Sequence, residues 1–203
     1  MAVVIDGTNG ISTPDLESAG PVTGTTGTFS GAVQASGVAT NLYPLVSSTV
    51  VASTSGTSID FNSIPSWAKR ITVMFQEVST NGSSLFLIQL GTSGGVQTSS
   101  YVSVFVYTGL GASGSATTQG FGIYNDGAGN YKNGAATLTL LNSANGTWVA
   151  QGIFIQGTGS SSPGYAMPTA GSKTLSGTLD RIRITTVNGT DTFDAGSINI
   201  MWE

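Results

Sequence analysis

Apolar and polar residues alternate with a period of two through most of the chain after residue 46, which is the pattern of half-buried β-strands. In residues 70–78, for example, Ile71, Val73 and Phe75 fall on one face of such a strand. Similar segments are residues 57–61, 84–90, 101–107, 136–140, 147–155, 181–187 and 196–202. No window of a dozen residues keeps the i, i+3, i+4 spacing of an amphipathic helix. We therefore predict an almost all-β fold with at least eight strands.

Asn-Gly dipeptides stand beside the predicted strands at four places, Asn81-Gly82, Asn133-Gly134, Asn145-Gly146 and Asn188-Gly189. Because both residues tolerate the positive φ angles of a type I′ turn, these dipeptides predict β-hairpins. The strands show no repeat of blade length, so the pattern favours an antiparallel jelly-roll-like β-sandwich over a propeller. A β-helix stays open as an alternative that no repeat supports.

The first 45 residues have a different composition, with no Lys or Arg and only scattered large apolar residues, too few to bury a core. A flexible Gly/Ser/Thr linker is one interpretation. The spaced apolar residues favour instead an extended arm that packs against its own copies or docks on another protein. We predict that residues 1–45 form an attachment and oligomerisation arm and that residues 46–203 form a β-sandwich head domain. The residues predicted to carry assembly are Val22, Phe29, Val33 and Val38.

The chain is poor in chemically reactive side chains, with no His, no Cys, six Lys and Arg and ten Asp and Glu in 203 residues. Histidine is the commonest general acid or base near neutral pH, so we predict no enzymatic activity and no catalytic residue, cofactor or metal. A Ser-Lys pair is a weak alternative. The closely spaced carboxylates Asp191 and Asp194 are the only candidates for glycoside hydrolysis in the predicted head domain, and an Asx-type turn explains them better.

Charge and hydropathy also restrict the partners. The net charge is −4, and the basic residues form no cluster beyond Lys69-Arg70 and Arg181-Ile182-Arg183, so neither nucleic acid nor an anionic membrane is an expected partner. No apolar stretch approaches the roughly 20 residues of a membrane-spanning helix. The first residues lack the positive region of a signal peptide, which predicts synthesis in the cytoplasm.

Tyrosines flanked by turn residues are candidates for a recognition surface, because the ring stacks on a ligand and the hydroxyl forms hydrogen bonds. The candidates are Tyr124, Asn125, Tyr131 and Tyr165. Tyr101 and Tyr107 lie in a predicted strand, which favours ordinary positions in the core for both.

Several motifs resemble virion proteins of tailed bacteriophages. The opening Asp6-Gly7-Thr8-Asn9-Gly10-Ile11-Ser12-Thr13-Pro14 and the later Gly27-Thr28-Phe29-Ser30-Gly31 are similar to the N-terminal arm of tail-fibre and head-fibre proteins. Residues 64–73 (Ile-Pro-Ser-Trp-Ala-Lys-Arg-Ile-Thr-Val) and 171–203 resemble a C-terminal β-domain of such virion proteins. The resemblance leaves residues 84–165 uncovered.

The resemblance implies a virion protein, made in the cytoplasm of the bacterial host, with an anchoring arm, a β-sandwich head and often a homotrimeric state. Its expected partners are its own copies and other proteins of the capsid or tail. The expected function is a structural one, as a tail fibre, head fibre or capsid decoration. The alternative is a receptor-binding module for a bacterial surface glycan or protein, and an enzyme that degrades surface polysaccharide is a third, weaker possibility.

Overall fold

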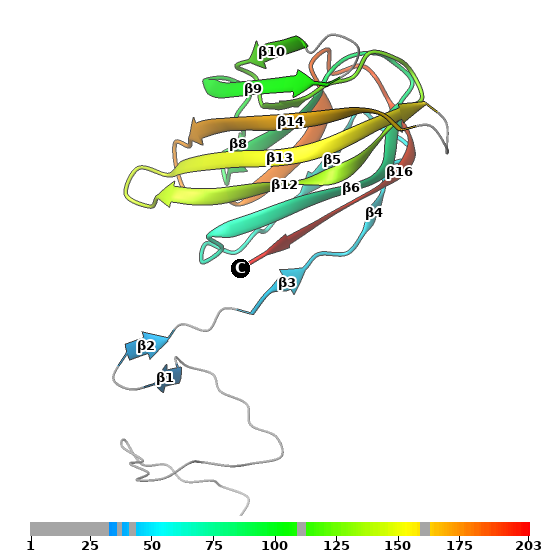
Figure 1. Cartoon of the computed structure of the whole chain (residues 1–203). Helices are drawn as coiled ribbons and strands as arrows, with labels where there is room; N and C mark the ends of the chain where they lie inside the picture. The colour runs from blue at the N-terminus through cyan, green and yellow to red at the C-terminus, as the bar shows by residue number, and fades with distance from the viewer. Residues whose placement is uncertain (1–32, 36–37, 41–43, 109–112, 159–162) are drawn as a thin grey trace, which may run out of the picture. The chain divides into compact units, whose positions relative to one another are not determined.

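The computed structural model describes residues 33–35, 38–40, 44–108, 113–158 and 163–203 (Figure 1). The chain divides into two compact units, residues 1–42 and residues 43–203. In the first unit, β1 (Val33–Ala35) pairs antiparallel with β2 (Val38–Thr40), and Val33 stands opposite Thr40. Two predicted assembly residues, Val33 and Val38, therefore belong to strands, and the other two, Val22 and Phe29, lie outside the described residues.

The second unit consists of two antiparallel sheets, which confirms the predicted all-β class. The larger sheet has nine strands, in the order β10 (Ser113–Thr117), β9 (Tyr101–Tyr107), β14 (Pro163–Thr174), β13 (Thr147–Thr158), β12 (Asn130–Asn142), β6 (Arg70–Thr80), β16 (Phe193–Trp202) and β3 (Val46–Ser47), with β4 (Val51–Ala52) also on β16. The smaller sheet has the order β11 (Phe121–Ile123), β7 (Phe86–Thr92), β15 (Arg181–Thr186) and β5 (Ser58–Phe61), with β8 (Gly95–Val96) on β7.

The hydrophobic core joins the inward faces of the two sheets. Ile71, Val73 and Phe75 of β6 are buried there, as their alternation predicts. Phe75 contacts the ring of Phe154 from β13 at 5.2 Å and the ring of Phe86 from β7 at 6.3 Å, both edge to face. The contact with Phe86 links the large sheet to the small one, and the contact with Phe154 joins two strands of the large sheet.

Each of the eight predicted strand segments overlaps a strand of the structure, and residues 101–107 coincide with β9. The principal strand that the sequence pattern missed is β14. It contains Pro168, which cannot donate a backbone hydrogen bond, and Gly164 and Gly171, which are depleted in strands. Pro168 is accommodated because the regular pairing between β14 and β9 stops at Thr169 and resumes only as an isolated bridge between Ala166 and Thr108.

The hairpin prediction is correct at Asn145-Gly146, which connects β12 to β13 with Gly146 at a φ of 68°. It is wrong at Asn133-Gly134, which lies inside β12, where Gly134 adopts a φ of 143° at a bulge. There the Asn133 Oδ1 atom accepts a hydrogen bond of 2.7 Å from the Glu77 backbone N–H, so the dipeptide supports a bulge instead of a turn. The other two dipeptides connect strands of different sheets and form no hairpin.

Candidate functional site

Four neighbouring strands of the large sheet place a row of polar and aromatic side chains at one end of the β-sandwich. Lys132 of β12 stands opposite Gln156 of β13, which in turn stands opposite Tyr165 of β14. Tyr107 lies at the corresponding end of β9. Tyr124, Asn125 and Asp126, which follow β11, complete this end of the sandwich. It therefore combines aromatic rings with hydrogen-bonding groups.

Three tyrosines at this end form one cluster, which we call the tyrosine cluster: Tyr107, Tyr124 and Tyr165. The rings of Tyr107 and Tyr124 are stacked with centroids 4.1 Å apart, and Tyr165 meets Tyr107 edge to face at 5.8 Å. All three are partly exposed. Burial raises the pKa of Tyr124 to about 12, and the negative charge of Asp126 adds to the rise. The Tyr124 hydroxyl is therefore a neutral donor and acceptor at physiological pH.

Lys132 and Asn125 form a buried pair beneath this end of the sandwich. The Lys132 ammonium is 2.8 Å from Asn125 Oδ1 and 3.0 Å from the Asn130 carbonyl oxygen, and it lies 5.2 Å from the centre of the Phe86 ring. Burial lowers the pKa of Lys132 to about 7, although the charge of Asp126 acts in the opposite direction.

Asn125 is only 4% exposed, and its amide N–H groups donate to the carbonyl oxygens of Gly82 and Ser84. Asn125 therefore supports the loop that carries Tyr124 and does not reach a recognition surface. This corrects the sequence-based placement. The turn residues around it are exposed, but its amide has enough backbone partners to be buried at low cost.

Asp126 and Gln156 lie next to the tyrosine cluster. The Gln156 amide donates to Asp126 Oδ1 at 2.5 Å, and Asp126 itself is exposed. The Gln156 Oε1 atom is buried and has no hydrogen-bond partner in the described part of the chain. Partly exposed rings beside an exposed carboxylate can together bind a polyhydroxylated ligand, with the rings against its C–H groups and the carboxylate on its hydroxyls.

Tyr131 lies apart from the cluster. It precedes the inward-facing Lys132 on β12 and so faces the outer side of the large sheet, where it is half-buried. Tyr101 is buried in the core, as predicted. Its hydroxyl has partners there, since it accepts a hydrogen bond from the Leu90 N–H and donates one to the Gln97 carbonyl oxygen. Tyr107 is the cluster member that sequence reasoning missed, since its alternation with Phe105 indicated only a core position.

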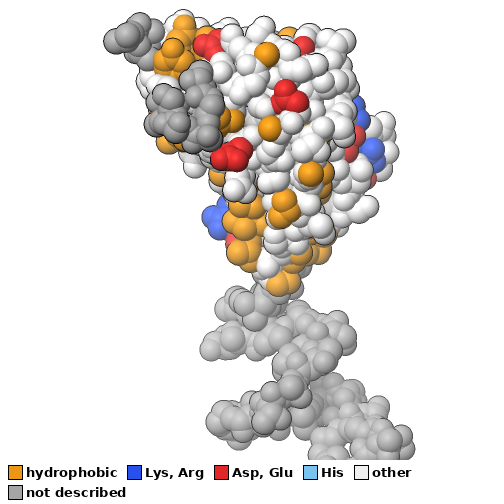
Figure 2. All heavy atoms as spheres, turned by 90° about the vertical axis from the view of Figure 1, so that its right-hand side faces the viewer, with side chains coloured by type: hydrophobic (Ala, Val, Ile, Leu, Met, Phe, Trp, Pro, Cys, Tyr) orange, Lys and Arg blue, Asp and Glu red, His pale blue; other side chains and the backbone are white. Residues whose placement is uncertain are grey.

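The two ends of the β-sandwich differ in charge. The acidic residues at the tyrosine-cluster end are Glu77, Asp126, Asp191 and Asp194. Figure 2 faces this end and shows acidic side chains spread across it, with basic side chains only at its margins. The opposite end carries the basic residues Lys69, Arg70 and Arg181, of which Arg70 pairs with Glu203 and Arg181 with Asp180. A ligand or surface therefore meets an acidic potential at one end and a weakly basic one at the other, where the charge of Lys69 is in excess.

The carboxylate candidates Asp191 and Asp194 are engaged with the protein itself. Asp191 accepts hydrogen bonds from the Ser84 N–H at 2.9 Å and from the Asn188 amide, and Asp194 is hydrogen-bonded to the Ser79 hydroxyl. Asn188 Oδ1 also accepts the N–H groups of Thr190 and Asp191, so the loop does contain an Asx-type turn, but it is built on Asn188 and not on the Asp191 or Asp194 carboxylate as predicted. Within the described ranges, no group of three or more Asp, Glu, His or Cys side chains could hold a metal ion.

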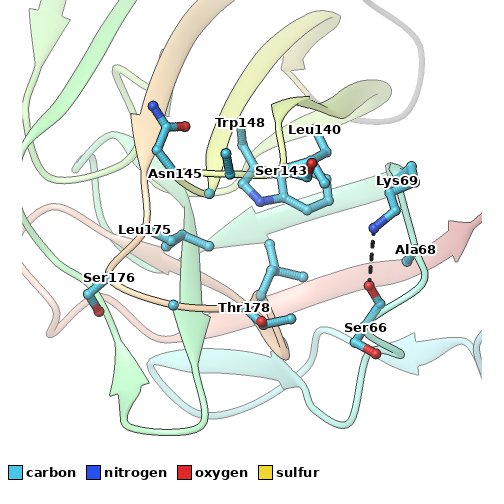
Figure 3. Close-up of a pocket in the computed structure, with 14 residues that line it drawn as sticks. Ser66, Ala68, Lys69, Leu140, Ser143, Asn145, Trp148, Leu175, Ser176 and Thr178 are labelled. Atoms are coloured by element: carbon cyan, nitrogen blue, oxygen red, sulfur yellow. Dashed lines mark hydrogen bonds between the residues drawn. The ribbon is translucent and has the colours of Figure 1, made fainter.

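A groove of about 470 Å³ lies at the opposite end of the sandwich, between three chain segments (Figure 3). Lys69 and Ser66 precede β6, Asn145 belongs to the β12–β13 hairpin, and residues 175–179 follow β14. Trp148 of β13 forms part of the floor. No sequence motif indicated this groove, because its residues come from distant segments that only the fold brings together.

Comparison with models of protein families, with curated proteins and with solved structures found no match to this chain. In the part of the chain that the structure describes, no helix has the length and apolar character needed to span a bilayer.

Proposed function

We propose that the chain is a structural component of a tailed-bacteriophage virion, as a tail fibre, head fibre or capsid decoration. In this proposal residues 1–45 attach it to other capsid or tail proteins, and the jelly-roll-like domain of residues 46–203 is presented outward. The protein is made in the cytoplasm of the bacterial host and acts in the virion as a homotrimer. The motifs near both ends of the sequence support this proposal.

The observation that carries the proposal is that the two ends of the β-domain differ. The chain enters the sandwich through β3, where Val46 pairs with Trp202 and Ser47 with Met201. This is the end of the sandwich that contains the groove, because Trp202 stands opposite Ile71, next to Lys69 and Arg70. The tyrosine cluster lies at the other end of the same strands. A domain that the chain enters at one end and that carries partly exposed aromatic rings at the other suits attachment and presentation.

The outer face of the large sheet supports self-association. Its exposed apolar residues lie on adjacent strands: Val102 and Val104 on β9, Ala166, Pro168 and Ala170 on β14, and Ile153 and Ile155 on β13. We call this set the outer apolar patch. None of its residues is charged, so copies of a chain with a net charge of −4 can meet there without placing like charges together. The proposed occupant of the patch is a second copy of this chain.

Deletion of residues 2–40 tests the attachment role. The truncated protein keeps every strand of the two sheets, so it should fold with a β-type circular dichroism spectrum, but it should be missing from purified particles. Full-length protein produced alongside particle assembly in the same manner as the truncated protein serves as the control, and it should be found in the purified particles. Incorporation of the truncated protein at the full-length level would refute the role of the arm.

The tyrosine cluster favours recognition of a bacterial surface glycan or protein as the second candidate function. For a receptor binder, purified protein should block phage adsorption, and Tyr124→Ala should weaken the block. Tyr131→Ala is the matched control, because Tyr131 is also half-buried but lies on the outer face of the large sheet. A purified protein that leaves adsorption unchanged would rule out receptor binding and would be compatible with a purely structural role.

A further inference from the structure

The groove at the basic end of the sandwich has an apolar floor and a polar rim. The floor includes Leu175 and Leu179, which are buried, and Trp148, which is only 3% exposed. The rim carries the side chains of Ser66, Lys69, Ser143, Asn145, Ser176 and Thr178. Figure 3 shows Lys69 and Ser66 on one side of the groove and Asn145 and Ser176 on the other. Its volume of about 470 Å³ is in the range of small-molecule sites.

Two side chains of this groove, Trp148 and Asn145, offer N–H groups, while its serine and threonine hydroxyls can either donate or accept. The indole N–H of Trp148 is turned toward the groove and has no acceptor in the described part of the chain (Figure 3). Asn145 Oδ1 already accepts the N–H and the hydroxyl of Thr147, at 3.2 and 2.7 Å, so its amide has only N–H groups left to offer. A ligand that pairs with the N–H groups of Trp148 and Asn145 must supply acceptors.

Lys69 adds an uncompensated positive charge. Among the residues that the structure describes, its ammonium makes only a long hydrogen bond of 3.4 Å, to the Ser66 carbonyl oxygen. The three arginines each pair with a carboxylate, Arg70 with Glu203, Arg181 with Asp180 and Arg183 with Asp60, and Lys132 and Lys173 are buried. Within the described ranges, Lys69 is thus the exposed cation that lacks a carboxylate partner. An anionic group on a ligand would supply one.

We infer that this groove binds a short anionic glycan segment that contains a uronic acid. The carboxylate of the sugar pairs with Lys69, its ring and hydroxyl oxygens accept from Trp148 and Asn145, and its C–H groups pack on the leucines of the floor. An extended peptide that binds by adding to a free strand edge fits less well. Here β12 and β13 are hydrogen-bonded on both sides.

The test uses the full-length ¹⁵N-labelled protein and follows the indole N–H signals of its three tryptophans by NMR. Trp67→Phe and Trp202→Phe identify the Trp148 signal by elimination. Trigalacturonic acid should shift that signal in a saturable manner, and maltotriose, a neutral sugar of the same length, should bind at least about tenfold more weakly. Lys69→Gln should weaken trigalacturonate binding by a similar factor, since the charge-assisted pair is lost.

Arg183→Gln is the matched control, because it removes the same charge from the small sheet and should leave trigalacturonate binding unchanged. The inference would be overturned by a Trp148 signal that trigalacturonate does not shift. Equal binding of trigalacturonate and maltotriose, or equal loss of binding in both charge variants, would also overturn it. None of these results bears on assembly of the virion, which the deletion of residues 2–40 tests separately.

Discussion

Lys132 makes the stability of the β-domain dependent on pH. Its pKa is lowered from 10.5 to about 7 by burial, so between these values the unfolded chain binds a proton that the folded chain does not. The free energy of unfolding should therefore rise as the pH increases from 7 toward 10, by at most about 1.4 kcal/mol per pH unit from this group. Below pH 7 the lysine is protonated in both the folded and the unfolded state, so this group no longer changes the free energy of unfolding with pH.

Lys132→Met checks this prediction, since methionine keeps most of the buried volume and cannot titrate. Urea unfolding of both proteins at several pH values between 6 and 10 should show a smaller rise for Lys132→Met than for the parent protein. The other titrating groups are common to both proteins and cancel in the difference. Parallel pH profiles would show that Lys132 is not the group responsible.

The sequence predicted some residues of the candidate site correctly and others not. The turn-rich surroundings of Tyr124 and Tyr165 indicated two of the three residues in the tyrosine cluster. The same reasoning placed Asn125 at the surface, because the backbone carbonyls that bury its amide come from residues 82 and 84, some 40 positions away in sequence. Contacts between segments that are distant in sequence decide whether a polar side chain is buried, and the residue type alone does not reveal these contacts.

At the scale of strands, a bulge crosses β12, β6 and β16. Glu77 in β6 has a φ of 53°, and its neighbours across the sheet include Gly134 at 143° and Gly196 at 88°. A Cβ atom on Gly196 would lie 2.4 Å from the Gln76 carbonyl oxygen. This contact and the positive φ together require glycine at this position.

Gly196→Ala should therefore lower the free energy of unfolding by at least about 2 kcal/mol, through backbone strain and the clash together. Gly189→Ala is the control, because Gly189 has a φ of 66° but nothing within 4 Å of the added Cβ. It should cost only the strain, about 1 kcal/mol. Equal losses for the two variants in urea unfolding would contradict the proposed clash.

The tyrosine cluster links β9 to the segment that follows β11. A double-mutant cycle with Tyr107→Leu and Tyr124→Leu should give a coupling energy of about 1 kcal/mol, as expected for stacked rings beyond their burial. Tyr107→Leu combined with Tyr131→Leu is the control cycle and should give a coupling near zero. A coupling near zero for the stacked pair would show that the two rings do not stabilise each other.

The strands themselves were largely predictable, because one buried face forces alternation along β6, β9 and β15. The alternation did not predict β14, because its Pro168 and its glycines are typical of a loop. The sequence did not predict the groove either, because the groove forms where a turn, a hairpin and a loop from separate parts of the sequence meet. Both features depend on pairing between segments that are distant in sequence.

For the whole molecule, the outer apolar patch should take part in self-association. Ile153, on the β13 side of the patch, is 64% exposed, so Ile153→Lys should not disturb the fold but should place like charges together between copies. We expect this variant to shift the mass in solution toward that of one chain. Val187→Lys, at an exposed apolar residue outside the patch, should leave the mass unchanged. An oligomer unaffected by Ile153→Lys would remove the patch from the interface.

Light scattering after size exclusion measures the absolute mass of the full-length chain and so decides whether the protein assembles with its own copies. For the proposed homotrimer we expect about three times the 20.5 kDa of one chain. We expect a single-chain mass for residues 46–203, because the outer apolar patch offers too few large side chains to hold copies together without the arm. A single-chain mass for the full-length protein would refute self-assembly.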